Sequence, residues 1–166
     1  MRVLGIDPGS IRLGYGIVEK AAGNGLVAVT DGVVTLDPAM PFSERLFVIS
    51  KRLNAVIEEF RPDAVAVESI FFAKNARSAS ILGHVRGVAL LASAVYGLPL
   101  FEYTPKTVKL AATGYGNAEK AQMQKMIQLL LKTDAVPKAD AADAMAVAIC
   151  HINHHRPGLD ANVGRG

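Results

Sequence analysis

The sequence has few features that would place the chain in an oxidising compartment or in a membrane. Cys150 is the one cysteine among its 166 residues, so no disulfide can form within the chain. Its apolar runs are interrupted by glycine, histidine or arginine well before the ~18 residues that a membrane span needs. The N-terminus also lacks the basic, apolar and small-residue order of a signal peptide. We therefore expect a reduced, cytoplasmic protein without a membrane segment.

The chain also lacks internal repeats, low-complexity tracts and linkers before its end. Its apolar content of 51% is too high for a disordered chain, and its length suits one domain with a sizeable core. We expect this domain to cover residues 1–155. Residues 156–166 are rich in glycine and polar residues, which predicts a disordered tail.

Acidic residues are scarce in the second half of the chain. Between Lys74 and Lys138 there are nine lysines and arginines but only three aspartates and glutamates, whereas the first 73 residues are slightly acidic. Such an asymmetry favours a polyanionic partner. The alternative is that these basic residues simply form a solvated surface.

Hydrophobic periodicity and turn signals predict an α/β fold. Three strands close together in sequence indicate an antiparallel meander, and later strands that alternate with helices complete a mixed five-stranded sheet with helices on both faces. The predicted order is βββαβαβαα, with a further short helix or turn through Ala112. The expected strands are 2–7, 12–20, 26–36, 64–67 and 99–103. The expected helices are 41–60 with Ser43 as N-cap, 75–96, 118–132 with Asn117 as N-cap, and 138–154.

Four carboxylates occupy structurally firm positions in this arrangement. Asp7 ends the first strand and Glu68 ends the fourth, while Asp140 and Asp143 are three apart and so share one face of the last helix. Carboxylates without histidine or cysteine at metal-ligand spacing suit Mg²⁺ or Mn²⁺ rather than zinc. The alternatives are a turn-capping role for Asp7 and helix capping for the last two acids.

The end of the last predicted helix carries four residues of types that often act in catalysis or metal binding. We expect Cys150 to lie in the core and not to act as a nucleophile. His151, His154 and His155 are expected to form the polar end of the helix rather than a ligand set.

Lys120 is in an unusual position for a lysine. Counted from Asn117 as the N-cap, it is the third residue of its helix, where a positive charge opposes the helix dipole. Because free N–H groups at a helix N-terminus attract anions, we expect Lys120 to contact a phosphate, with Lys109 as a second contact. Solvated side chains are the alternative for both lysines.

The predicted helix at about 75–96 is apolar nearly all round. Between Ile81 and Val95 only His84, Arg86 and Ser93 are clearly polar, so the helix should be covered on more than one side. Gly83 and Gly87 leave a smooth strip where another backbone can approach. The sequence alone is consistent with a dimer interface or with a central helix in one subunit.

Together, these motifs resemble those of the RuvC-type Holliday junction resolvases, over nearly the whole chain to about His154. The resemblance implies an RNase H-like fold and a Mg²⁺-dependent endodeoxyribonuclease that resolves four-way DNA junctions by paired symmetric nicks, in DNA recombination and repair. The motifs are Gly5-Ile6-Asp7-Pro8-Gly9, Gly14-Tyr15-Gly16, Val67-Glu68, Phe71, Ala73-Lys74-Asn75-Ala76, Gly83 to Gly87, Ala118-Glu119-Lys120, and Ala139-Asp140-Ala141-Ala142-Asp143-Ala144.

The resemblance also implies how the site works. Two Mg²⁺ ions, replaceable by Mn²⁺, would hydrolyse a DNA phosphodiester, with Asp7 bridging both ions as our hypothesis. Phe71 matches a family position whose aromatic ring stacks on an unpaired base at the junction centre. The implied metal ligands are Asp7, Glu68, Asp140 and Asp143, with Lys120 as a further catalytic residue. The expected DNA contacts are Phe71, Lys74, Arg77, Lys109 and Lys120.

Family members act as twofold homodimers, which favours the dimer interface for the helix at about 75–96. Their usual partners are the RuvA and RuvB branch-migration proteins. Three other functions compete with this interpretation: an actin- or hexokinase-like phosphotransferase, an RNase H-like nuclease acting on RNA, and a junction-binding protein that has lost catalysis.

Overall fold

A computed structural model describes residues 1–69 and 76–155, so the expectations for Phe71, Lys74 and the tail at 156–166 lie outside the described residues. The strands are β1 (Arg2–Asp7), β2 (Arg12–Lys20), β3 (Leu26–Thr35), β4 (Ala64–Glu68) and β5 (Leu100–Tyr103). The helices are α1 (Phe42–Phe60), α2 (Ala76–Val95), α3 (Pro105–Thr113), α4 (Lys120–Leu131) and α5 (Ala139–His154), with a short 3₁₀ turn, η1 (Ala22–Asn24).

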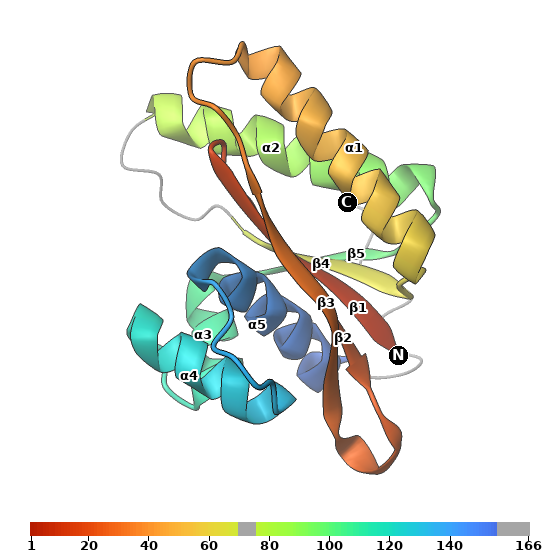
Figure 1. Ribbon diagram of the computed structural model, residues 1–166, viewed down its shortest axis with the longest axis vertical. Helices are drawn as coiled ribbons and strands as arrows, with labels where there is room; N and C mark the ends of the chain where they lie inside the picture. Colours follow the sequence, from red (N-terminus) through yellow and green to blue (C-terminus); the bar gives the residue numbers. More distant parts are fainter. Residues whose placement is uncertain (70–75, 156–166) are drawn as a thin grey trace.

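The five strands form one mixed sheet in the order β3-β2-β1-β4-β5 (Figure 1). β2 runs antiparallel to both β1 and β3, whereas β4 runs parallel to β1 and β5 runs parallel to β4. The central strand β1 is therefore paired along both edges. This topology confirms the predicted RNase H-like sheet.

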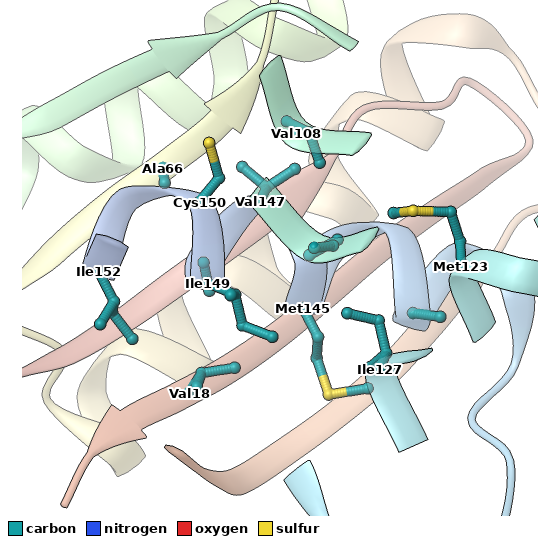
Figure 2. Packing of buried hydrophobic residues seen from close by; sticks show 14 of the residues in the cluster. Val18, Ala66, Val108, Met123, Ile127, Met145, Val147, Ile149, Cys150 and Ile152 are labelled. Carbon is teal, nitrogen blue, oxygen red and sulfur yellow. The ribbon is translucent and has the colours of Figure 1, made fainter. Parts of the chain in front are cut away.

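Helices cover both faces of the sheet, as predicted. In Figure 1, α1 and α2 lie on one side of the strands, and α3, α4 and α5 lie on the other. Because side chains alternate along a strand, Leu4 and Ile6 join the core under α1 and α2, while Val3 joins the core under α5. Figure 2 shows this second core, where Met145 and Ile149 of α5 lie among side chains of the sheet and of α4.

Two helix starts and the extent of one helix differ from the sequence prediction. α1 begins at Phe42 after Pro41, so Ser43 is not its N-cap. α4 begins after Glu119 rather than Asn117, because the backbone N–H of Glu119 donates to Oε1 of Gln122 at 2.9 Å in a capping box. The predicted helix or turn after β5 is the complete helix α3, so three helices follow β5 in the observed order.

α2 has an inner face in the core and an apolar outer face. Val85, Ala89 and Ala92 are buried with α1 and the sheet, whereas Leu91 and Val95 are 62% and 65% exposed. Among the described helices, α2 is the one whose length and composition would allow a membrane span, a test that core helices of soluble proteins also pass. The structure thus accounts for the inner face of α2 but not for its outer face.

Glycines in β1 and β2 let the backbone of α5 lie directly on the sheet. A methyl group added at Gly5 would overlap the carbonyl oxygen of Ala144 and lie 2.8 Å from the backbone nitrogen of Ala148. At Gly14 it would overlap the carbonyl oxygen of Asp140. Glycine within a strand marks such close backbone approaches, and here the approach sets the position of the first turns of α5.

Replacing Gly5 with alanine should therefore destabilise the protein. The new methyl group can fit only if α5 moves away from the sheet, and overpacking of this kind costs ~1–3 kcal/mol. Urea unfolding monitored by circular dichroism measures the change. Gly25→Ala is the matched control, since its backbone is extended and, among the described residues outside its two chain neighbours, the Ala21 side chain alone lies near the added methyl, at 4.0 Å. Equal stability of the two variants would contradict the close approach.

Candidate active site

The parallel strands place two carboxylates at the same edge of the sheet. Asp7 is the last residue of β1 and Glu68 is the last residue of β4, each one residue beyond the registered pair Ile6 and Val67. By strand alternation, Asp7 is on the same face as Val3 and Glu68 is on the same face as Ala66. Both carboxylates therefore lie on the face of the sheet that α5 covers.

The N-terminal turns of α5 bring two further carboxylates to this edge. Asp140 lies over Gly14, and Gly14 pairs with Asp7 across β1 and β2. Ala141 and Ala142 are fully buried, which leaves Asp140 and Asp143 on the partly exposed side of the helix. The glycine contacts and the alanine-rich turn thus position the α5 acids beside the strand acids.

A cavity of about 300 Å³ lies where these elements meet. It contains three of the four predicted carboxylates and both predicted lysines, whereas Asp140 is beside the cavity and does not line it. Its lining residues are Asp7, Glu68, Pro105, Val108, Lys109, Lys120, Met123 and Asp143. Residues from two strands and three helices therefore form one acidic cavity with a basic side.

The environment of Asp7 strongly favours the protonated carboxyl group. Burial, followed by the charges of Glu68, Asp143 and Asp140, raises the pKa of Asp7 to about 8, against a smaller opposing effect of Lys120. Burial penalises the charged form of an acid, and neighbouring negative charges penalise it further. Asp140 is thus close enough to act on Asp7 although it lies outside the cavity.

Glu68 and Asp143 show the same effect. Burial and the charge of Asp143 raise the pKa of Glu68 to about 7, while Lys109 and Lys120 oppose the shift. Burial also raises the pKa of Asp143, although Lys120 counteracts it. Raised pKa values in a cavity are typical of functional sites, because such crowding of acids is unfavourable unless a cation relieves it.

Two basic side chains lie next to the α5 acids. Nζ of Lys120 is 3.8 Å from Oδ2 of Asp143, and Nη1 of Arg12 is 3.9 Å from Oδ2 of Asp140. Lys120 is the first residue of α4 and not the third, and Gln122 completes the capping box there. A phosphate contact by Lys120 is therefore expected from its position at the cavity and not from its being the third residue of a helix.

The donor atoms fit a hard cation, but they are not preassembled around one. The acidic side chains that line the cavity are all carboxylates, and Mg²⁺ and Mn²⁺ prefer carboxylate oxygens as ligands. Within residues 1–69 and 76–155, no three histidine, cysteine, aspartate or glutamate side chains are grouped as a metal site. The acids share a cavity and an electrostatic field without forming a finished set of ligands.

The histidine prediction is wrong for His151. His151 is only 1% exposed, stacks on Phe101 with ring centroids 4.2 Å apart, and has Nδ1 2.8 Å from the hydroxyl of Tyr103. It is therefore part of the interior between α5 and β5 rather than a polar helix end. Cys150 is buried, as expected, and burial raises the pKa of its thiol to about 12, which keeps it un-ionised.

Sequence reasoning missed two features of this region, namely Arg12 and the role of the glycines. Gly5, Gly14 and Gly16 all contact α5, and the signal available was glycine at alternate positions of a strand. Arg12 carried no local signal, because its partner Asp140 is distant in sequence. Arg77, a predicted DNA contact, is exposed in the first turn of α2 and does not line the cavity.

An RNase H-like sheet with acids gathered at the carboxyl ends of its parallel strands defines the class as an RNase H-like nuclease. The family model described as crossover junction endodeoxyribonuclease RuvC matches residues 3–151. The chain belongs to the RuvC family.

Individual relatives agree with this assignment. The chain is 53% identical over 153 residues to the crossover junction endodeoxyribonuclease RuvC of Geobacter sulfurreducens, covering 92% of this chain and 93% of the relative. It is 49% identical over 159 residues to the RuvC of Ruminiclostridium cellulolyticum, covering 95% of each. Thermus thermophilus RuvC in complex with Holliday junction substrate superposes with a TM-score of 0.86 and 36% identity, covering 92% of this chain and 93% of that one.

The raised pKa of Asp7 makes the stability of the metal-free protein depend on pH. Between about pH 4 and 8 the folded protein holds a proton that the unfolded chain has released, so stability is highest in acid and falls as pH rises through this range. Asp7→Asn removes this proton. As the pH rises from 5 to 8, wild type should therefore lose on the order of 2 kcal/mol more free energy of unfolding than the variant.

Urea unfolding in EDTA at pH 5 and pH 8 measures this difference. Asp31→Asn is the matched control, because Asp31 is an exposed acid of β3 and does not line the cavity. Parallel changes in stability for wild type and Asp7→Asn would contradict the proposed crowding of acids.

Proposed function

We propose that this chain is a Mg²⁺-dependent endodeoxyribonuclease that resolves four-way DNA junctions by paired symmetric nicks, in DNA recombination and repair. The observation that carries the proposal is the cavity that Asp7, Glu68 and Asp143 share with two lysines, in a chain of the RuvC family. RuvC of Thermus thermophilus bound to a Holliday junction substrate has the same fold over most of its length. These two findings favour DNA junctions over RNA or nucleotides as the substrate.

The four carboxylates are the proposed ligands of two divalent ions. When bound, the ions would supply a water-derived nucleophile and stabilise the leaving 3′-oxygen. Asp7 is the candidate to serve both ions, because the charges of the other three acids all act on it. Glu68 would serve one site, and Asp140 with Asp143 the other. Binding of cations would also relieve the repulsion that raises the carboxyl pKa values.

The lysines of the cavity are the proposed contacts of the scissile phosphate. Lys120 is 76% exposed and yet beside Asp143, so its ammonium group can reach both the acids and a ligand that enters from solvent. Lys109 lines the same cavity from α3. Lysine binds phosphate as a mobile point charge, and two such charges would hold the DNA backbone against the carboxylates.

Further DNA contacts are proposed from the sequence alone. Phe71 would stack on an unpaired base at the junction, an interaction worth ~1–3 kcal/mol per base. Lys74 and Arg77 would contact the backbone nearby. The exposed position of Arg77 at the start of α2 is compatible with this role.

We also propose that the protein is a homodimer through α2. The outer face of this helix exposes Leu91 and Val95, and an alanine methyl at Gly83 or Gly87 would meet no atom of residues 1–69 and 76–155 within 4 Å, apart from the adjoining backbone of α2 itself. A twofold axis through this face would bury the apolar side chains and let two backbones approach closely. It would also present two identical active sites, which suits a junction of near-twofold symmetry.

The remaining expectations follow from the family and the sequence. The enzyme would be cytoplasmic and would work with the RuvA and RuvB branch-migration proteins. Residues 1–155 would form the nuclease domain, and residues 156–166 would form a disordered tail.

Cleavage of a labelled synthetic four-way junction tests the proposed function. Loss of a residue that merely supports a metal ligand costs ~10–100-fold in activity. Because Asp7 is a proposed ligand itself, we expect Asp7→Asn to lose more than this, while junction binding persists. Wild type should require Mg²⁺ or Mn²⁺ and cut opposing strands symmetrically.

The controls distinguish the competing functions. Asp31→Asn should cleave like wild type, and structured RNA should remain uncut. Unchanged turnover in Asp7→Asn would exclude the proposed metal site. Preferred cleavage of RNA would assign the chain to a different substrate.

The dimer is tested by placing charge on the outer face of α2. Leu91→Lys with Val95→Lys should weaken dimerisation by at least ~10-fold, since each buried apolar side chain contributes ~1.5–3 kcal/mol. Sedimentation velocity over a concentration series measures the dissociation constant. Phe47→Lys on α1 is the matched control, because Phe47 is 64% exposed and lies on another helix. Equal effects of both substitutions would rule out α2 as the interface.

A further inference from the structure

Arg12 is a basic residue beside the candidate active site, and it is neither a proposed metal ligand nor one of the two lysines proposed to bind the scissile phosphate. It is the first residue of β2, two residues before Gly14, which pairs with Asp7. Its guanidinium Nη1 is 3.9 Å from Oδ2 of Asp140, and its side chain is 67% exposed. Arg12 therefore lies beside one of the α5 acids, as Lys120 lies beside the other.

The contacts of Arg12 do not amount to a structural role. At the opposite end of the chain's first hairpin, Arg2 donates two hydrogen bonds to Glu19 at 2.8 and 3.1 Å and one to the carbonyl of Phe60 at 2.6 Å. The ion pair of Arg12 is longer than a hydrogen bond and solvent-exposed, and pairs of this kind contribute only ~0–1 kcal/mol. The fold thus gains little from the guanidinium of Arg12.

The backbone that carries Arg12 is nevertheless firmly held. Nη1 of Arg45 donates to the carbonyl oxygen of Ser10 at 3.0 Å, and the backbone N–H of Leu36 donates to that of Ile11 at 2.9 Å. A methyl group at Gly9 would overlap the carbonyl oxygen of Arg12. The side chain thus projects from a fixed point next to the acids, which lowers the ordering cost of binding a ligand.

We propose that Arg12 binds a backbone phosphate of the DNA on the β2 side of the carboxylates, in addition to the α3 and α4 lysines. The proposal rests on the proposed function. A cation held by the Asp140 oxygens would offset their charge, and Arg12 would then be released from its acidic partner. Its planar fork can then engage phosphate oxygens through two parallel hydrogen bonds, a geometry that lysine cannot reproduce.

Junction binding by Arg12→Gln tests this contact. We expect at least ~5-fold weaker binding of a labelled immobile four-way junction in Ca²⁺, and a salt slope of log affinity lower by about 0.9 per protomer, the value for one lost phosphate contact. Arg12→Lys should recover the slope but only part of the affinity. Both variants should unfold in urea at the same midpoint as wild type.

Lys20→Gln is the matched control, because Lys20 is an exposed cation at the other end of β2. It should bind the junction with the affinity and salt slope of wild type. Unchanged affinity and salt slope in Arg12→Gln, or an equal loss in Lys20→Gln, would overturn the phosphate contact. Because wild type would still bind the junction in either case, the proposed function would stand. Wild type that fails to bind the junction would overturn the proposed function itself.

Discussion

The close approach of α5 to the sheet is the constraint on which the rest of the structure depends. At Gly5 of β1 and Gly14 of β2, the helix backbone lies against the strand backbone with no side chain between them. This contact brings the first turns of α5, and with them Asp140 and Asp143, beside the strand end that carries Asp7. A larger side chain at Gly5 or Gly14 would separate the α5 acids from the strand acids without altering any of the four.

The same contact creates an electrostatic conflict that the fold must tolerate. Three partly buried carboxyl groups share one cavity, and the pKa values of the two from the strands are raised to about 8 for Asp7 and about 7 for Glu68. The lysines on α3 and α4 reduce the conflict without removing it. A cation bound to these carboxylates would relieve the repulsion between them and would therefore stabilise the folded protein.

The sequence predicted what depends on strand geometry, but it left one helix start undecided and missed a contact between distant residues. Asp7 and Glu68 could be placed together because the ends of neighbouring parallel strands share an edge. The start of α4 was predicted wrongly, because Asn117 and Glu119 can both cap a helix and only the Gln122 hydrogen bond decides between them. His151 is buried by Phe101 of β5, about fifty residues earlier in the chain, and no local pattern reveals that contact.

The alternation of side chains along β1 sends neighbouring residues to opposite faces of the sheet. Ile6 packs in the core under α1 and α2, whereas Asp7, the next residue, faces the cavity under α5. A shift of one residue in register would exchange these environments and bury the acid in an apolar core. Because β1 pairs with β2 along one edge and β4 along the other, such a shift would have to break both ladders. The central strand thus fixes Asp7 on the face that α5 covers, while α2 lies over the opposite face and exposes Leu91 and Val95.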